Sequence, residues 1–130
     1  MLDKIYEMNK HFQLKAGQPV PTYPIALDAE RAKLRAKWMS EELQEFLAAS
    51  DIYQQADALT DLLYYLMGTY VEMCIKPGPL YEIVHEANMK KLTSPNGIIR
   101  DDDGKIQKPF DWKHPDTAIK AAIDHMKNNA

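Results

Sequence analysis

The sequence contains a single cysteine, Cys74, and no long uninterrupted apolar run. One cysteine cannot form a disulfide within its own chain, which suits a reducing cytosol, and we interpret it as a small buried hydrophobe. The longest apolar stretch, Leu62 to Ile75, is broken by Glu72 and is too short to cross a bilayer. The residues from Met1 to Lys4 lack the basic and apolar regions of a signal peptide. We therefore expect a soluble, cytoplasmic protein that does not enter a membrane.

The sequence also lacks a large excess of either charge. Its 16 Lys and Arg residues against 19 Asp and Glu residues give a net charge of −3 at pH 7. This balance argues against binding to a nucleic-acid backbone, and it favours a small-molecule partner. Apolar residues make up 45% of the 130 residues, which argues against disorder and suffices for the core of one domain spanning 1–130.

Apolar residues recur at spacings of three and four along most of the chain, which predicts an all-α fold of four to five helices. A proline-rich connector, Gln18 to Ala26, separates the first helix from the rest. Asp28 and Asp51 are suitable N-caps for the next two helices. The helices are expected at Leu2–Lys15, Ala29–Ala49, Ile52–Ile75, Leu80–Leu92 and about Asp116–Asn128.

Two helix faces can be assigned from this spacing. The inner face of the first helix is expected to consist of Ile5, Met8, Phe12 and Leu14. The basic residues at the start of the second helix are expected to face solvent or a partner subunit, and a phosphate contact from one of them stays open; they are Arg31, Lys33, Arg35 and Lys37.

Acidic side chains interrupt the apolar surface of the second and third helices. Glu41, Glu42 and Glu45 fall within an arc of roughly 100° at the rim of the core. Asp57 and Asp61 are four residues apart and share a helix face. If the chain reverses near Asp51, the two acidic groups lie at the same height on neighbouring antiparallel helices.

Converging carboxylates repel each other and resist burial unless a positive charge lies between them. A hard divalent cation that prefers oxygen ligands, such as Mg²⁺, suits this position, and Mn²⁺ is a possible substitute. The alternative is a solvated acidic helix face that binds no metal.

Two later segments carry further signals. Along the fourth helix, His85, Asn88 and Lys91 lie on neighbouring faces and form a polar strip that suits a nucleotide. After it, the segment 98–108 has an Asp-Gly turn signal at Asp103-Gly104 and is predicted to form a small C-terminal β-hairpin. Such a hairpin must pack on the helices because an isolated one is marginal in water.

These motifs resemble those of a known superfamily. The two acidic segments are similar to the metal motif of the MazG-like all-α nucleoside triphosphate pyrophosphohydrolases, which also include dimeric dUTPases and phosphoribosyl-ATP pyrophosphohydrolase. The segments 84–92 and 103–109 are similar to the bacterial and phage branch described as phosphoribosyl-ATP-pyrophosphohydrolase-like. Together the matching segments span roughly Pro24 to Asp116, and the chain resembles a single MazG-like domain. The motifs themselves are Glu41-Glu42-Leu43-Gln44-Glu45, Asp57-Ala58-Leu59-Thr60-Asp61-Leu62-Leu63-Tyr64 and Val84-His85-Glu86-Ala87-Asn88-Met89-Lys90-Lys91-Leu92.

The resemblance implies Mg²⁺-dependent hydrolysis of a nucleoside triphosphate between the α and β phosphates, as in the control of nucleotide pools. It implies metal binding by Glu42, Glu45 and Asp61, with Asp57 as an outer or second-metal ligand. Glu41 would then orient or deprotonate the attacking water. The substrate contacts that it implies come from Asn88, Lys91, His85 and Tyr65.

The chain departs from the superfamily pattern at one position, where Ala58 stands in place of the usual Glu. The departure leaves the number of bound metal ions open. The sequence also leaves open the base and sugar of the substrate, among them dUTP, dCTP or a non-standard nucleotide.

Other interpretations compete with this one. Within the enzyme class, the alternative substrate is phosphoribosyl-ATP. A non-enzymatic helical binding module is a second alternative. A di-iron bundle is a third, because Glu82 and His85 have Glu-x-x-His spacing, although that architecture needs two such pairs and the chain has one. The third helix is apolar on nearly every side, so we also expect a homodimer or homotetramer.

Overall fold

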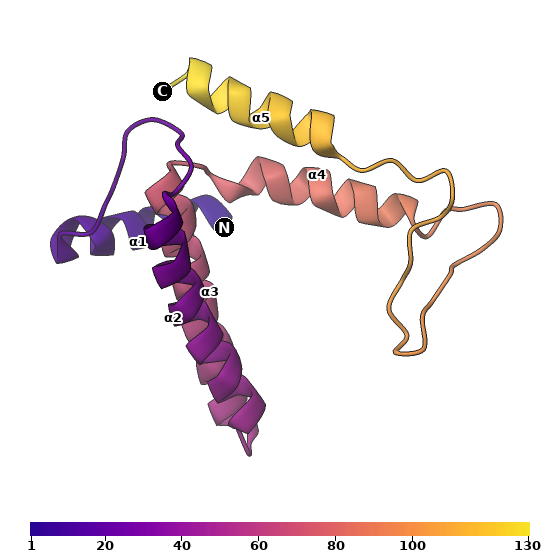
Figure 1. The fold of residues 1–130 in the computed structure, drawn as a ribbon, viewed down its shortest axis with the longest axis horizontal. Helices are drawn as coiled ribbons and strands as arrows, with labels where there is room; N and C mark the ends of the chain where they lie inside the picture. The colour runs from indigo at the N-terminus through magenta and orange to yellow at the C-terminus, as the bar shows by residue number, and fades with distance from the viewer. The chain divides into compact units, whose positions relative to one another are not determined.

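The computed structural model describes residues 1–130, and Figure 1 shows an all-α chain without strands. Its helices are α1 (Leu2–Ala16), α2 (Ala29–Ala48), α3 (Ile52–Met73), α4 (Pro77–Lys90) and α5 (Asp116–Asn128). The predicted all-α class is confirmed. None of the helices combines the length and the apolar character that crossing a bilayer requires.

The chain divides into two compact units, Met1–Lys76 and Pro77–Asn129. In the first unit, α2 and α3 form an antiparallel helical hairpin, and α1 packs against α3 (Figure 1). In the second unit, α4 packs against α5. The prediction of a single domain stays a prediction.

The turn between α2 and α3 is fixed by capping. Asp51 precedes α3, and its carboxylate accepts a hydrogen bond from the Gln54 amide at 2.8 Å. The Gln54 side chain accepts in return from the Ser50 amide at 2.9 Å, one residue before the position expected of a capping box. At the other end of α2, Asp28 caps the helix through the Arg31 amide at 2.8 Å. These caps set where the two acidic segments begin and therefore how they face each other.

The core of the first unit lies where α1 crosses α3. Tyr6, Met67 and Val71 are buried there, and partly buried apolar side chains surround them. The predicted inner face of α1 is wrong for Met8, Phe12 and Leu14, which are 48–60% exposed, whereas Ile5 packs against the core as predicted. Instead α1 buries Tyr6, Asn9 and Gln13. The helix is turned so that two of its amides, and not its longest apolar side chains, face α3.

The start of α4 also differs from the prediction. The helix predicted to begin at Leu80 begins instead at Pro77. Proline is favoured in the first turn of a helix because the missing N–H would be unpaired there in any case. α3 ends at Cys74, whose backbone is left-handed with φ 54°.

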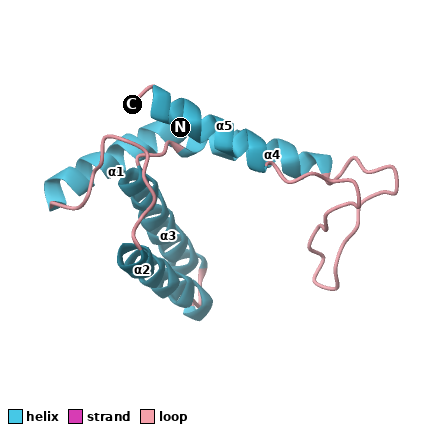
Figure 2. Ribbon diagram, turned by 45° about the horizontal axis from the view of Figure 1, so that its top comes forward, coloured by secondary structure: helices cyan, strands magenta, loops and turns pink.

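The predicted β-hairpin is absent. Arg100 and Ile106 form one isolated antiparallel bridge, and the Gly104 amide donates to the Asp101 carbonyl at 3.0 Å across the turn. The turn therefore forms where it was expected, but the flanking residues do not extend into strands. Ile98 and Ile99 are 47% and 43% exposed, so this segment buries no apolar face that would stabilise a two-stranded ladder. Figure 2 shows the segment after α4 as a loop.

Candidate metal centre and adjoining pocket

Three of the predicted metal ligands come together on the α2–α3 hairpin. Glu42 and Glu45 lie one turn apart on α2, and Asp61 faces them from α3. One carboxylate oxygen from each lies within 4.8 Å of the others. None of the three carboxylates takes part in a salt bridge within the chain. We call Glu42, Glu45 and Asp61 the acidic cluster.

Glu42 has a buried carboxylate oxygen and is surrounded by other acidic side chains. Its Oε2 atom is buried and has no hydrogen-bond partner. Burial, followed by the hydrogen-bonding and charge effects of Glu45 and the charges of Asp61 and Asp57, raises the pKa of Glu42 to about 7. A cation bound next to a buried carboxyl group with a raised pKa stabilises the charged form of that group.

The donor set of the acidic cluster fits a hard divalent cation. Carboxylate oxygens are the ligands that Mg²⁺ prefers in proteins, and Mg²⁺ usually retains some water when few carboxylates hold it. The Oε2 atom of Glu42 is buried and has no hydrogen-bond partner, so a cation could bind to it. Glu42, Glu45 and Asp61 can therefore hold such an ion together.

The remaining predicted site residues lie elsewhere. Glu41 and Asp57 are exposed on α2 and α3 and are outside the acidic cluster, although the charge of Asp57 acts on Glu42. Tyr65 is half-buried on α3 and lines a pocket.

Three predicted substrate contacts belong to the second unit. His85 and Asn88 lie on α4, and Lys91 follows it. The Lys91 ammonium lies 4.9 Å from the centre of the Trp112 ring, and Lys108 approaches the same ring at 5.4 Å. This cation–π contact gives Lys91 a local role within its own unit.

The di-iron alternative finds no support in the arrangement of ligands. Glu82 and His85 both lie on α4, but they belong to no group of three or more ligating side chains. Such a centre needs a second pair of the same kind.

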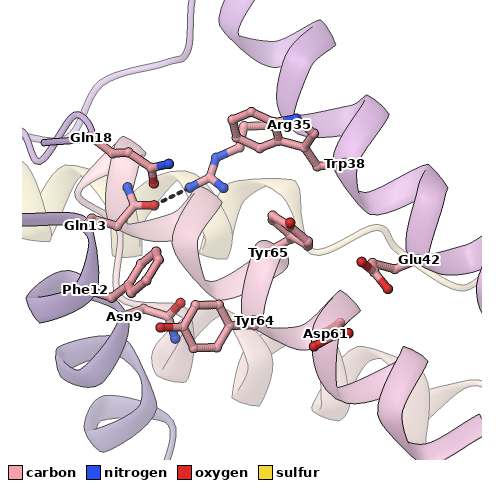
Figure 3. Close-up of a pocket in the computed structure, with 10 residues that line it drawn as sticks. All are labelled: Asn9, Phe12, Gln13, Gln18, Arg35, Trp38, Glu42, Asp61, Tyr64 and Tyr65. Carbon is pink, nitrogen blue, oxygen red and sulfur yellow. Dashed lines mark hydrogen bonds between the residues drawn. The ribbon is translucent and has the colours of Figure 1, made fainter. Parts of the chain in front are cut away.

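A pocket of about 330 Å³ adjoins the acidic cluster within the first unit. Glu42 and Asp61 form part of its wall, so the pocket and the candidate metal centre share two residues (Figure 3). The other lining residues are aromatic or carry amide and guanidinium groups; they are Asn9, Phe12, Gln13, Gln18, Arg35, Trp38, Tyr64 and Tyr65.

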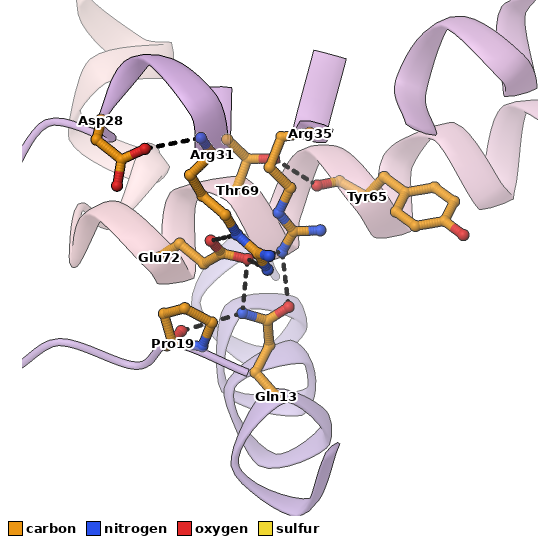
Figure 4. Close-up of polar contacts among 8 residues, drawn as sticks. All are labelled: Gln13, Pro19, Asp28, Arg31, Arg35, Tyr65, Thr69 and Glu72. Atoms are coloured by element: carbon orange, nitrogen blue, oxygen red, sulfur yellow. Dashed lines mark hydrogen bonds and ion pairs between the residues drawn. The ribbon is translucent and has the colours of Figure 1, made fainter. Parts of the chain in front are cut away.

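A buried ion-pair network closes one side of the pocket. The Glu72 carboxylate accepts from Arg31 at 2.7 Å and lies 2.6 Å from Arg35, and the Gln13 amide donates to it at 3.3 Å (Figure 4). Arg35 donates in turn to the Gln13 carbonyl oxygen at 2.6 Å. The prediction that Arg31 and Arg35 face solvent or a partner subunit is wrong, because both turn inward to Glu72.

Glycine at position 68 makes room for this network. A Cβ atom at Gly68 would lie 2.7 Å from Nη2 of Arg35 and 3.2 Å from Oε1 of Gln13. The guanidinium therefore occupies the space that a side chain at position 68 would fill.

Sequence reasoning gave no site role to several residues here, among them Asn9, Gln13 and Glu72, and it expected Arg35 to face solvent or a partner subunit. Glu72 did leave a signal, because a lone carboxylate within the apolar stretch Leu62 to Ile75 requires a buried partner.

Comparison with known families gives one match. A family model described as phosphoribosyl-ATP pyrophosphohydrolase matches residues 5–88. The match contains the acidic cluster and every residue of the adjoining pocket. It begins earlier than the resemblance seen in the motifs, so that it includes most of α1, and it ends before the loop around Asp103. The chain matches none of the curated proteins.

Proposed function

The chain belongs to the phosphoribosyl-ATP pyrophosphohydrolase family, within the MazG-like superfamily, and on that premise we propose that it hydrolyses a nucleoside triphosphate to a monophosphate and pyrophosphate. The family implies pyrophosphohydrolase activity on a nucleotide-like substrate. The triphosphate, the divalent cation and the roles of single residues are our proposal.

The observation that carries the proposal is the acidic cluster beside a pocket with aromatic walls. A triphosphate bears several negative charges and cannot approach three carboxylates without positive charge between them. Mg²⁺ or Mn²⁺ held by Glu42, Glu45 and Asp61 would supply that charge and would stabilise the leaving pyrophosphate.

The reaction itself is a substitution at the α phosphorus. The oxygen of a water molecule bonds to this phosphorus while the bond to the oxygen that bridges the α and β phosphates breaks. The bridging oxygen leaves with pyrophosphate, and the water loses a proton. We assign Glu41 to orient this water and accept its proton, since an exposed carboxylate next to the acidic cluster in sequence is free to act as a base. Asp57 is assigned as an outer ligand, through its charge on Glu42.

Phosphoribosyl-ATP is a second candidate substrate, and the family match favours it. It also carries a triphosphate, so the acidic cluster would serve both substrates in the same way.

Asn88, Lys91 and His85 stay predicted contacts to phosphate or sugar. For Lys91→Ala we expect chiefly a higher KM, because a charge contact present in both ground and transition states is lost.

One assay tests the proposed function. Purified protein is mixed with canonical deoxynucleoside and ribonucleoside triphosphates, non-standard triphosphates and phosphoribosyl-ATP, with Mg²⁺ or Mn²⁺, and pyrophosphate release is measured. We expect release that stops when the metal is chelated.

The variant Glu45→Ala should reduce the rate by more than about 100-fold, since loss of a supporting outer residue alone costs 10–100-fold at a metal site. Its helical circular dichroism signal should not change, because Glu45 is exposed. Full activity in Glu45→Ala, or release that persists in chelator, would disprove the metal assignment.

The predicted homodimer or homotetramer belongs to the same proposal. Leu59, Leu63 and Leu66 on α3 are 41–48% exposed, which is in keeping with a further chain covering this helix. Light scattering on the purified protein measures the oligomeric state directly.

A further inference from the structure

Asn9 lies in the wall of the pocket beside the acidic cluster, and its amide is only half satisfied. The residue is 2% exposed. Its Nδ2 atom donates to the carbonyl of Ile5 at 3.1 Å, while its Oδ1 atom is buried and has no partner. Because a carbonyl oxygen accepts and cannot donate, the contact with Ile5 fixes which end of the amide is the nitrogen. The free oxygen is therefore a fixed acceptor in the pocket wall.

An unpaired buried acceptor of this kind destabilises the fold. A buried polar atom without a partner costs about 1–3 kcal/mol, and most buried polar atoms in folded proteins are paired. A leucine of similar size would avoid that cost. The position of Asn9 in a pocket wall indicates that a ligand with an N–H or O–H group completes the bond (Figure 3).

The rest of the pocket narrows the chemistry of that ligand. Phe12 and Tyr64 meet edge to face with ring centres 5.4 Å apart, and Trp38 and Tyr65 lie 5.9 Å apart. Aromatic side chains in a pocket wall favour a ligand with an aromatic ring. Arg35 adds a donor, because its Nε atom is buried and unpaired while its Nη2 atom is held by Glu72 and Gln13.

We propose that Asn9 reads the nucleobase of the substrate: the base lies among the aromatic side chains and donates an N–H to the Asn9 oxygen, while Arg35 donates to an acceptor on the base. The inference rests on the proposed function, because the acidic cluster at the edge of the pocket then receives the phosphates of the same nucleotide. Gln18 also lines the pocket, and its side-chain oxygen is buried and unpaired. No hydrogen bond fixes the orientation of the Gln18 amide, so it can turn to match the base.

The test separates recognition of the base from recognition of the phosphates. Inorganic tripolyphosphate carries the phosphates without a base and serves as a competitive inhibitor. For Asn9→Leu we expect the KM of the preferred nucleoside triphosphate to rise about 3- to 10-fold, the effect of one lost hydrogen bond. The inhibition constant of tripolyphosphate should stay the same. The melting temperature should be equal or higher, since an unpaired buried oxygen is removed. The control Asn128→Leu, on the exposed end of α5, should change none of the three.

Two results would overturn the inference: an unchanged KM for Asn9→Leu, or an equal loss of affinity for tripolyphosphate and nucleotide. A lower melting temperature would count against it as well, because it would show that Asn9 stabilises the fold.

A second measurement does not depend on catalysis or on the folding of a variant. Calorimetry of the wild-type protein in EDTA compares binding of nucleoside monophosphates with binding of ribose 5-phosphate. We expect at least one nucleoside monophosphate to bind more tightly. Such binding without any pyrophosphate release would disprove the proposed function and uphold the base pocket, whereas equal binding of all these compounds would disprove the base pocket alone.

Discussion

The α2–α3 hairpin carries buried or clustered carboxylates in two regions. Basic side chains pair with the carboxylate in one region, and no basic side chain pairs with those in the other. Near the open end, the side chain of Glu72 is 0% exposed and is paired with Arg31 and Arg35. Nearer the turn, Glu42 meets only other acids, those of Glu45 and Asp61. The chain thus supplies its own cations at one end of the hairpin and none at the other.

The pKa values follow this difference. Burial alone would raise the pKa of Glu72, but hydrogen bonds from Arg31 and Gln13 and the charge of Arg35 hold it below its usual range. Burial and neighbouring acids instead raise the pKa of Glu42 to about 7. Because the same chemical group is satisfied in one region and left unsatisfied in the other, we interpret Glu72 as part of the fold and Glu42 as part of a site that takes a cation from solution.

The largest effect on stability is expected at Glu72. In Glu72→Gln, Arg35 stays buried without an opposite charge, and breaking one partner of a buried pair costs about 3–5 kcal/mol. Urea denaturation of the metal-free protein measures this loss. The matched variant Glu45→Gln removes a charge from the acidic cluster and should leave stability unchanged or slightly higher. A comparable loss in both variants would abolish the distinction between the two regions.

A smaller loss is expected at Gly68, which lies under the Arg35 guanidinium. The Cβ of Gly68→Ala would lie 2.7 Å from Nη2 of Arg35 and would push it away from Glu72. Overpacking costs about 1–3 kcal/mol, and the better helix propensity of alanine returns up to about 1 kcal/mol, so we expect a net loss of about 1–2 kcal/mol. In the double variant with Glu72→Gln the two losses should not add, since both act on Arg35. Full additivity, measured by the same denaturation, would contradict this coupling.

The smallest expected effect is a pH dependence of opposite sign in the two regions. The pKa of Glu42 is raised from 4.5 to about 7, so the stability that it contributes is fully present below about pH 4.5 and is lost as pH rises through about 7. The pKa of Glu72 is lowered, so its contribution is present above its ordinary pKa and is lost as pH falls through the lowered value.

The contribution of Glu42 should be about 1 kcal/mol or less, because the side chain is half-buried and solvent screens it. Thermal melting between pH 5 and 8 without metal, compared with Glu42→Gln, isolates this contribution. The variant should show a flatter profile than the wild type over this range. Identical profiles would mean that Glu42 does not titrate as described.

The sequence predicted the acidic cluster because helical spacing and a capped turn are local properties. Asp51 fixes the start of α3, and residues at equal distances from the turn then face each other across the hairpin. The ion-pair network instead joins residues far apart in the sequence, because Arg31 and Arg35 of α2 pair with Glu72 of α3 and Gln13 of α1 completes the contacts. Spacing placed Met8 and Phe12 on the inner face of α1, whereas the structure buries Asn9 and Gln13 there, and Gln13 finds hydrogen-bond partners in Pro19 and Glu72. Polar side chains at a helix crossing cannot be recognised by an apolar pattern.

The prediction of a β-hairpin in the loop after α4 was wrong for a related reason. The turn at Asp101–Gly104 is dictated by its own residues and forms as predicted, with the Asp101 amide donating to the Lys105 carbonyl at 2.9 Å. Strands on either side need an apolar face to bury, and Ile98 and Ile99 find none within the chain.

The most direct test of the comparison is Mn²⁺ binding, followed by the electron paramagnetic resonance signal of the free ion. We expect the wild-type protein to bind Mn²⁺, Glu42→Gln and Glu45→Gln to bind it at least about tenfold more weakly, and the Gly68→Ala variant, altered only at the ion-pair network, to bind it as the wild type does. Equal Mn²⁺ affinity in the wild type and in Glu42→Gln and Glu45→Gln, or no binding by the wild type, would contradict the claim that the acidic cluster is a cation site.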